Sequence, residues 1–168
     1  MNDRVVFDCM VYLQAATNEN GPAFACFRMA EEGQVTLCVS AEVLAEVQDV
    51  LSRPALKAKF PHLTPELIET FLQRVRAKAL ALDEIPKVIF HPRDPDDEPY
   101  LNLAVAAGAR FLVSRDKDLL DLMSDSAFRS RSPGLVILDP IVFLREIRAL
   151  REETITKPAA SQEKTDPV

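Results

Sequence analysis

Acidic side chains are concentrated in two groups, within residues 94–98 and 115–118, that an apolar segment separates. The segment contains a run that favours a buried helix, residues 101–107, and then a run that favours a strand, residues 111–114. One acidic group therefore precedes a helix and the other follows a strand. Both are expected at the same end of a parallel sheet, where clustered carboxylates predict part of a metal site.

Other carboxylates follow or flank other predicted strands. Asp8 stands at the end of the predicted strand 4–7, whose apolar residues 5–7 lie almost at the start of the chain, as in a central buried strand. Glu42 and Glu46 share one face of a helix predicted over residues 41–51, directly after a strand. Ligand groups collect beyond the carboxyl ends of parallel strands. Four positions are therefore expected in one cleft: Asp8, Glu42 or Glu46, Asp96 or Asp97, and Asp116 or Asp118.

Carboxylates held this close together repel one another, so cations or protons must neutralise them. Hard oxygen ligands without nearby histidine or cysteine favour Mg²⁺ or Mn²⁺ over zinc. Two such ions about 3.5–4 Å apart activate water and stabilise the leaving oxygen in displacement at phosphorus. The residues thus indicate phosphodiester hydrolysis. Each acid alone also fits a structural role, because Asp97 and Asp116 each stand where they could cap a helix.

Strands and helices alternate along the chain, which predicts an α/β fold with helices on both faces of a parallel sheet. The segment 85–90 contains Pro86 and is expected to be an edge strand, and residues 124–134 are expected to form a loop. The other strands are predicted at 4–7, 35–39, 111–114 and 135–138, and the helices at 10–16, 22–32, 41–51, 65–79, 100–107, 117–123 and 141–151.

Length and composition fit one compact domain. The chain has 168 residues, of which 48% are hydrophobic and 27% charged, and this is enough to bury a core. We expect the domain to span residues 1–151, and the polar residues 152–168 to be a disordered tail. Three cysteines favour free thiols, and the N-terminal sequence predicts neither a signal peptide nor a membrane span. These features predict a cytoplasmic protein.

The net charge of −6 argues against broad electrostatic binding of nucleic acid. A local excess of positive charge lies within residues 52–78, which contain six basic residues and only two acidic ones, Glu66 and Glu69. A solvated helical face is the simpler interpretation, but this stretch is also the one candidate for contacting phosphates. The residues proposed for that contact are Arg53, Lys57, Lys59 and Arg76.

Four segments carry a resemblance to a known family: residues 5–8 (VVFD), 44–54 (LAEVQDVLSRP), 94–97 (DPDD) and 112–119 (LVSRDKDL). Over about residues 4–145 the chain resembles the PIN-domain family. More narrowly, it is similar to toxin components of bacterial toxin–antitoxin systems, the VapC-type ribonucleases. The resemblance implies a Mg²⁺- or Mn²⁺-dependent endoribonuclease with an RNA substrate. It also implies a three-layer α/β/α sandwich with four to five parallel strands, a homodimer and a small antitoxin partner.

Matched position by position, the resemblance assigns the catalytic acids to Asp8, Glu46, Asp97 and Asp116. All of these except Glu46 are also assigned as metal ligands. The auxiliary candidates are Ser114, Asp118, Glu42 and Asp96. Asp94 and Asp96 are expected to act chiefly as turn residues.

One position departs from the family pattern, because Met10 stands where the family usually has an asparagine. Methionine cannot replace the hydrogen bonds of that amide. A catalytically impaired PIN-like module that binds RNA or a protein partner is therefore the alternative. A hydrolase of the haloacid-dehalogenase type would need an aspartate at Met10. A receiver domain would need an acceptor directly after residues 35–39, where the nearest acid is Glu42.

Overall fold

The computed structural model describes residues 2–91 and 93–156. Within these residues, five parallel strands form one sheet in the order β3-β2-β1-β4-β5. The strands are β1 (Arg4–Phe7), β2 (Thr36–Ser40), β3 (Leu80–Leu82), β4 (Phe111–Val113) and β5 (Val136–Leu138). The predicted parallel α/β fold is confirmed.

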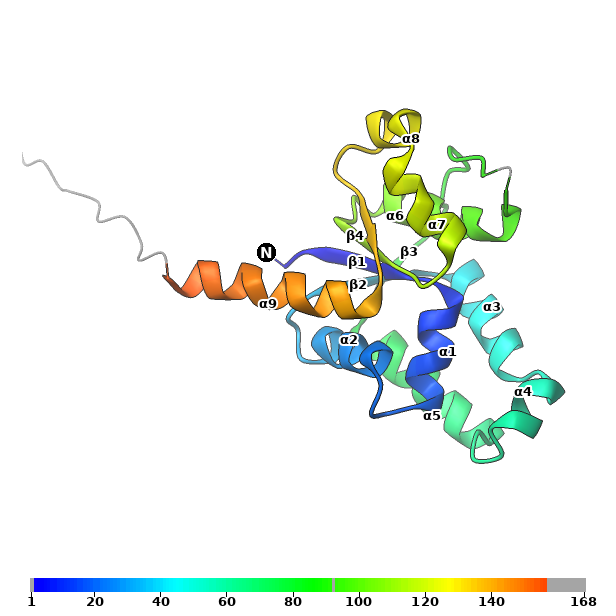
Figure 1. Ribbon diagram of the computed structural model, residues 1–168. Coiled ribbons are helices and arrows are strands. Elements are labelled where there is room, and N and C mark those ends of the chain that lie inside the picture. The colour runs from blue at the N-terminus through cyan, green and yellow to red at the C-terminus, as the bar shows by residue number, and fades with distance from the viewer. Residues whose placement is uncertain (1, 92, 157–168) are drawn as a thin grey trace, which may run out of the picture.

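Helices cover both faces of the sheet, which gives the expected three layers. Figure 1 shows α1, α2, α5 and α9 on one side of the sheet and α6, α7 and α8 on the other. The helices are α1 (Cys9–Thr17), α2 (Pro22–Glu31), α3 (Ala41–Leu51), α4 (Pro54–Lys59), α5 (Pro65–Lys78), α6 (Glu98–Ala106), α7 (Lys117–Asp121), α8 (Ser126–Arg131) and α9 (Pro140–Thr156), with short 3₁₀ helices η1 (Pro95–Asp97) and η2 (Leu122–Ser124).

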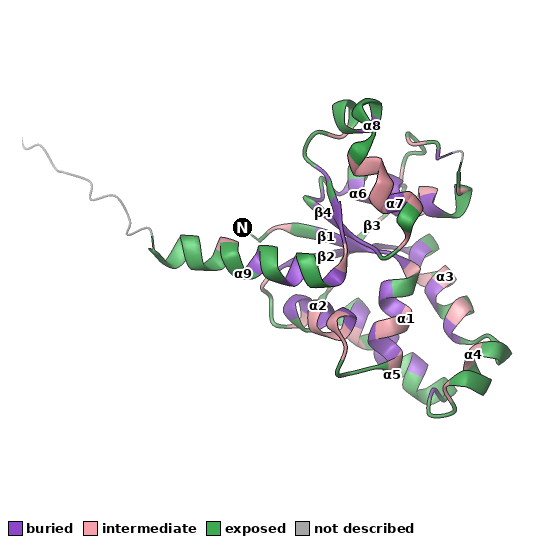
Figure 2. Cartoon of the chain, viewed as in Figure 1, coloured by how far each residue is buried: buried purple, intermediate pink, exposed green. Residues whose placement is uncertain are grey.

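The core lies on both sides of β1 and β4, whose apolar runs are buried (Figure 2). Consecutive buried residues are typical of a strand that is covered on both faces. On one face Phe143 of α9 packs against Phe7 and Phe111, with ring centroids 6.4 and 5.5 Å apart. On the other face, Leu101 and Leu103 of α6 are fully buried. The two central strands are therefore rigidly held where they end.

The connections place a crevice at the carboxyl ends of β1 and β4. These strands are neighbours, but β1 leads through α1 and α2 to β2, whereas β4 leads through α7 and α8 to β5 on its other side. Ligands in open α/β sheets bind at such a reversal of strand order. Asp8 follows β1 and Ser114 follows β4, so both lie at this crevice.

The predicted edge strand over residues 85–90 is wrong. These residues form neither helix nor strand, and the edge of the sheet is β3, where Leu80 pairs with Cys38 of β2. The backbone N–H groups of Val88 and Ile89 donate instead to the side-chain oxygen of Asn102, at 2.9 and 2.8 Å. The buried Asn102 side chain on α6 thus accepts the backbone hydrogen bonds that a neighbouring strand would otherwise accept.

Two further predictions about local structure need correction. Residues 124–134 are not simply a loop, because Asp125 caps α8 by accepting hydrogen bonds from Ala127 and Phe128, and Phe128 is buried. The last helix runs to Thr156 rather than to about residue 151. The rest of the expected disordered tail, 157–168, lies outside the described residues. The short helix α4 was not predicted.

Among the described residues, no helix combines the length and the apolar composition that crossing a membrane requires.

Candidate metal centre

Asp8 and Ser114 meet where β1 and β4 end. The pairing of Phe7 with Val113 brings these next residues together, and the amide of Asp8 donates to the carbonyl of Val113 at 3.1 Å. The Asp8 carboxylate caps α1 by accepting from the amide of Val11 at 2.9 Å, and it also accepts from the Ser114 hydroxyl. Asp8 is only 4% exposed. Hydrogen bonds to both of its oxygens therefore hold the Asp8 carboxylate in place.

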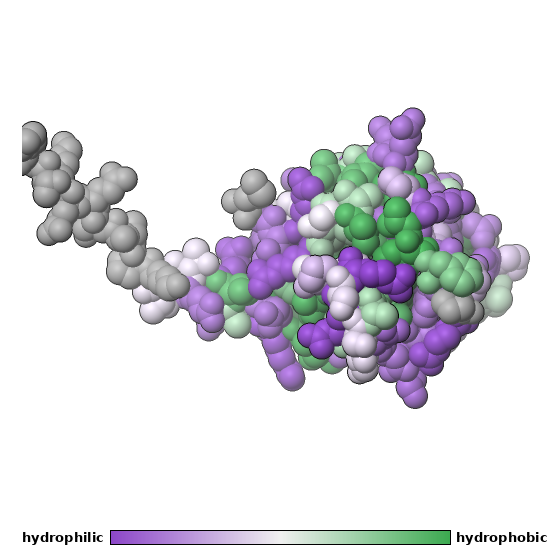
Figure 3. Space-filling view, turned by 90° about the horizontal axis from the view of Figure 1, so that it is seen from above, coloured by the Kyte–Doolittle hydropathy of each residue, from purple (hydrophilic) through white to green (hydrophobic). Residues whose placement is uncertain are grey.

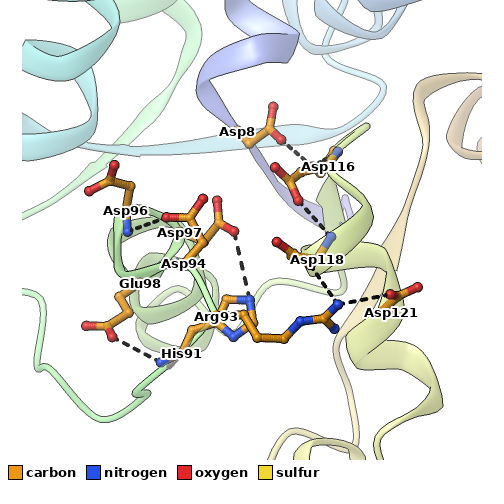
Figure 4. A network of polar contacts seen from close by, with 11 residues as sticks. Asp8, His91, Arg93, Asp94, Asp96, Asp97, Glu98, Asp116, Asp118 and Asp121 are labelled. Carbon is orange, nitrogen blue, oxygen red and sulfur yellow. Dashed lines mark hydrogen bonds and ion pairs between the residues drawn. The ribbon is translucent and has the colours of Figure 1, made fainter.

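Asp116 is tied to the same network from the start of α7. Its amide donates to Ser114 Oγ at 2.9 Å, so one hydroxyl group positions both acids. The Asp116 carboxylate caps α7 by accepting from the amide of Asp118 at 2.7 Å. The Asp118 carboxylate points to Arg93, with an ion pair of 2.8 Å. Figure 4 shows these contacts along one wall of the crevice.

Asp97 and Asp94 face Asp116 from the other wall, at the start of α6. One carboxylate oxygen from each of these three residues lies within 4.8 Å of the other two. We call Asp94, Asp97 and Asp116 the carboxylate triad (Figure 4). Asp97 is 9% exposed, and within the described part of the chain its Oδ2 has no hydrogen-bond partner.

The expectation that Asp94 is chiefly a turn residue was incomplete. Its carboxylate does accept from the amide of Asp96 at 3.0 Å, as a turn residue does. However, residues three apart face the same way across a 3₁₀ turn, and η1 therefore brings Asp94 beside Asp97. The spacing of these two acids was the signal that could have revealed the pair. Asp96 is exposed and lies outside the triad.

Two basic residues at this site were missed. His91 is buried, and its Nε2 lies 3.9 Å from Asp97 Oδ2 without a hydrogen-bond partner among the described residues. The amide of His91 donates to the Glu98 carboxylate at 3.0 Å, which holds the segment against α6. Arg93 pairs with Asp118. The one available signal was two basic side chains directly before the acidic run.

Glu46 lies outside the triad, although it faces the same region from α3. Its carboxylate accepts a hydrogen bond from the buried Tyr100 hydroxyl of α6 at 2.5 Å. Glu46 also raises the pKa of Cys9, which burial chiefly brings to about 11. With Glu42 and Asp96 it lines a cavity of about 340 Å³. This cavity is a separate hollow between α3 and the start of α6.

A model of the PIN domain family matches residues 4–118. The chain belongs to this family. No curated protein matches the chain. PIN domains are generally nucleases and typically use divalent metals, and the matched residues include the strand ends and helix starts that carry the triad.

Burial and nearby negative charges raise the pKa values of two carboxyls of this PIN domain, Asp8 and Asp97. Burial, followed by the charges of Asp116 and Asp94, raises the pKa of Asp97 to about 7. Burial also raises the pKa of Asp8 to about 6, although the hydrogen bond from Ser114 opposes the shift. Carboxyls with pKa values this high hold protons that a bound cation would displace.

The triad fits a divalent cation in its donor chemistry. It offers three carboxylate oxygens, the donors that hard divalent cations prefer. Leaving a buried polar atom unpaired costs about 1–3 kcal/mol. Because Asp97 Oδ2 is such an atom within the described residues, a cation there would offset that cost. Asp94, Asp97 and Asp116 would hold the ion, and Asp8, whose charge acts on Asp97, would join them as a fourth ligand.

We expect the metal-free PIN domain to lose stability as the pH rises from about 4 to about 7. The folded protein keeps protons on Asp8 and Asp97 up to pH values near 6 and 7, whereas the unfolded chain releases them near pH 4. The folded state therefore binds more protons in this window, and the loss for one such group is on the order of 3 kcal/mol. Urea unfolding in chelator at pH values from about 4 to about 8, which cover this window, measures it. A stability that stays constant or increases over this range would contradict the expectation.

Met10 does not supply the polar contact that the family pattern leads one to expect. It is the second residue of α1, and 47% of its surface is exposed. Its side chain carries only a weakly accepting thioether. Where the family's asparagine would make a hydrogen bond, another residue of this PIN domain has to make it.

The four basic residues predicted to contact RNA fall into two pairs. Arg53 and Arg76 form ion pairs with Asp49 and Glu69, at 3.0 and 3.6 Å. Lys57 and Lys59 are exposed on α4, which follows α3 beyond the end of that helix (Figure 1). Because Arg53 and Arg76 are already paired, the two exposed lysines are the better placed to contact the phosphates of an RNA strand.

Proposed function

We propose that this protein is an endoribonuclease that hydrolyses RNA phosphodiesters with Mg²⁺ or Mn²⁺ held by Asp8, Asp97 and Asp116, joined by Asp94. The observation that carries the proposal is the carboxylate triad at the reversal of strand order, with one buried oxygen of Asp97 unpartnered in the described residues. The resemblance to VapC-type ribonucleases supports a role as a cytoplasmic toxin that acts as a homodimer and is held by a small antitoxin.

Each residue of the centre has a task that follows from its contacts. Ser114 orients Asp8 with its hydroxyl proton and Asp116 with an oxygen lone pair. Each Asp8 oxygen accepts one hydrogen bond and keeps a second lone pair for an ion or a proton. When bound, the metal supplies a nucleophilic water and stabilises the leaving oxygen. Asp118 pairs with Arg93, and this contact links the start of α7 to the segment before η1.

Glu46 is proposed as the fourth catalytic acid, reaching the substrate from α3. The hydroxyl of Tyr100 donates to it and fixes its carboxylate. Glu42 and Asp96 line the same cavity and are proposed as auxiliary acids. These three acids line a different cavity from the one that His91 lines, so they would contact a different part of the RNA.

The experiment that tests the proposal is cleavage of end-labelled RNA with and without Mn²⁺. Single-stranded and structured RNA are compared, and Asp116→Ala is the control. We expect metal-dependent internal cleavage that Asp116→Ala abolishes. Cleavage that is independent of metal, or equal in the variant, would indicate a contaminating nuclease and overturn the proposal.

Charge reversal at Lys57, Lys59 and Arg76 is expected to weaken RNA binding and to flatten its salt dependence. Each lost phosphate contact reduces the slope of log K against log salt by about 0.7 for a single strand. Fluorescence anisotropy with labelled RNA between 50 and 300 mM salt, roughly the range in which such contacts dominate, measures both effects. Reversal at Arg145 and Arg148, exposed on α9, is the matched control. An unchanged slope would remove the basic stretch from the RNA path.

The second candidate function is a PIN-like module that binds RNA or a protein partner without cleaving. The exposed Met10 in place of a polar residue favours this alternative. It predicts RNA binding by the wild type with no cleavage at any Mn²⁺ concentration. Met10→Asn would then restore cleavage if this position alone were responsible.

A further inference from the structure

A second cavity, of about 520 Å³, opens beside the carboxylate triad. Its walls come from the segment before η1 and from α6, α7 and α8. Apolar residues such as Val88, Phe90 and Phe128 lie there beside charged ones, which include Asp121 and Asp125. Arg93 and Arg131 stand among the lining residues. Figure 3 shows hydrophobic side chains gathered within a polar surround on the face of the molecule seen from above. The volume is typical of pockets that bind small ligand groups.

Two residues belong to both this cavity and the metal centre. His91 lines the cavity, and its Nε2 is 3.9 Å from Asp97 Oδ2. Arg93 also lines the cavity and pairs with Asp118 at 2.8 Å. Figure 4 shows both side chains pointing toward the acidic residues. If one phosphate of an RNA strand lies at the triad, the adjoining nucleotide therefore lies at the cavity.

The aromatic ring of Phe90 lies at this cavity and is not packed in the hydrophobic core. Its surface is 73% exposed, and that of Val88 is 61% exposed. The backbone on either side is nevertheless held, by Asn102 at Val88 and Ile89 and by Glu98 at His91. The ring is thus displayed by a segment that is anchored on both sides.

We propose that this cavity is a subsite for one unpaired nucleobase of the RNA, stacked on Phe90 next to the phosphate at the metal centre. The inference rests on the proposed nuclease function and specifies its substrate. Aromatic side chains stack on the bases of single strands, whatever the base. Arg131 is exposed at the cavity, where it can contact the adjoining phosphate. Double-helical RNA keeps its bases stacked inside, so the subsite selects single strands and loops.

The chain contains no tryptophan, so Phe90→Trp introduces a single indole at the subsite, whose emission can be excited separately from that of the two tyrosines. The experiment titrates Phe90→Trp, in an Asp116→Ala background that prevents cleavage, with a ten-nucleotide single-stranded RNA and with the same sequence as a blunt duplex. The single strand is expected to quench the indole and saturate at least about fivefold more tightly than the duplex. Ile155→Trp, at a residue of α9 that is 82% exposed, is the matched control and should not respond.

A second measurement removes the ring instead of labelling it. Phe90→Ala is expected to weaken single-strand binding by roughly fivefold to a hundredfold, the effect of losing one stacked base, while Phe90→Tyr restores it. Because the side chain is exposed, neither variant removes core packing. Unchanged affinity in Phe90→Ala would overturn the inference.

The outcomes separate the subsite from the nuclease function. Wild-type cleavage without quenching of Phe90→Trp overturns the subsite and leaves the nuclease function standing. Quenching without wild-type cleavage supports the subsite and overturns the nuclease function. Equal quenching by the duplex overturns stacking. An emission shift that depends on protein concentration, with no response to RNA, assigns the patch to a protein interface and also overturns the inference.

Discussion

Asp97→Asn is expected to reduce metal-dependent RNA cleavage by at least about a hundredfold, the usual loss when one preorganised electrostatic contact is removed from a transition state. Asp97 is buried beside Asp94 and Asp116, and its raised pKa arises from burial and from those charges. The asparagine keeps the size and removes the charge. Initial cleavage rates at saturating Mn²⁺ measure the effect.

The substitution Asp3→Asn is the control. Asp3 precedes β1, at the opposite end of the sheet from the crevice, and forms a surface ion pair with Arg110, so its neutralisation should leave the rate within about twofold, as is usual for surface substitutions. Both variants replace one acid by its amide, so they change the net charge equally. Equal losses in the two variants would mean that the triad does not distinguish the catalytic acid, and the assignment of Asp97 would fail.

Mn²⁺ is expected to stabilise the wild-type protein by about 2.7 kcal/mol at a concentration of one hundred times its dissociation constant, because an ion that binds only the folded state shifts the equilibrium by mass action. Binding also relieves the repulsion that adds to the effect of burial in raising the pKa of Asp97. Asp116→Ala removes one of the three triad oxygens and should lose most of this gain. Unfolding in urea after treatment with chelator, with and without added Mn²⁺, measures it.

Asp49→Asn serves as the control for this stabilisation. Asp49 forms a surface ion pair with Arg53 on α3, and such pairs contribute little to stability. Its variant should therefore respond to Mn²⁺ like the wild type. An equal response in Asp116→Ala would place the ion elsewhere, and no response in the wild type would favour the non-catalytic module.

The sheet could be predicted because its central strands carry their signal locally. Residues 5–7 and 111–113 are continuous apolar runs, and the structure buries them between two layers of helices. The edge strand carries no such signal, since β3 has three residues and none is buried. The segment 85–90, which was predicted to be the edge strand, is rich in strand-forming side chains. However, its backbone amides at Val88 and Ile89 donate to the Asn102 side chain instead of to a neighbouring strand. That contact joins residues far apart in sequence and has no local pattern.

The site could be predicted as far as strand ends and helix starts determine it. Asp8 and Asp116 lie at the crevice because each follows a central strand. Asp94 joins Asp97 through a 3₁₀ turn whose path Pro95 obscures in the sequence. The contacts of His91 with Asp97, and of Glu46 with Tyr100, depend on how a loop and two helices pack. Such contacts follow from tertiary structure alone.

Calorimetric titration of the wild-type protein with Mn²⁺ at pH 6, in two buffers with different ionisation enthalpies, is the most direct test of the metal centre. The Asp97 carboxyl, with a pKa of about 7, is mostly protonated at this pH and must release its proton when an ion binds. Asp8, with a pKa of about 6, is about half protonated at this pH. We predict saturable binding with release of between about one and two protons at pH 6 and almost none at pH 8. Absence of saturable binding, or binding that Asp97→Asn leaves unchanged, would contradict the assignment of a metal centre to these carboxylates.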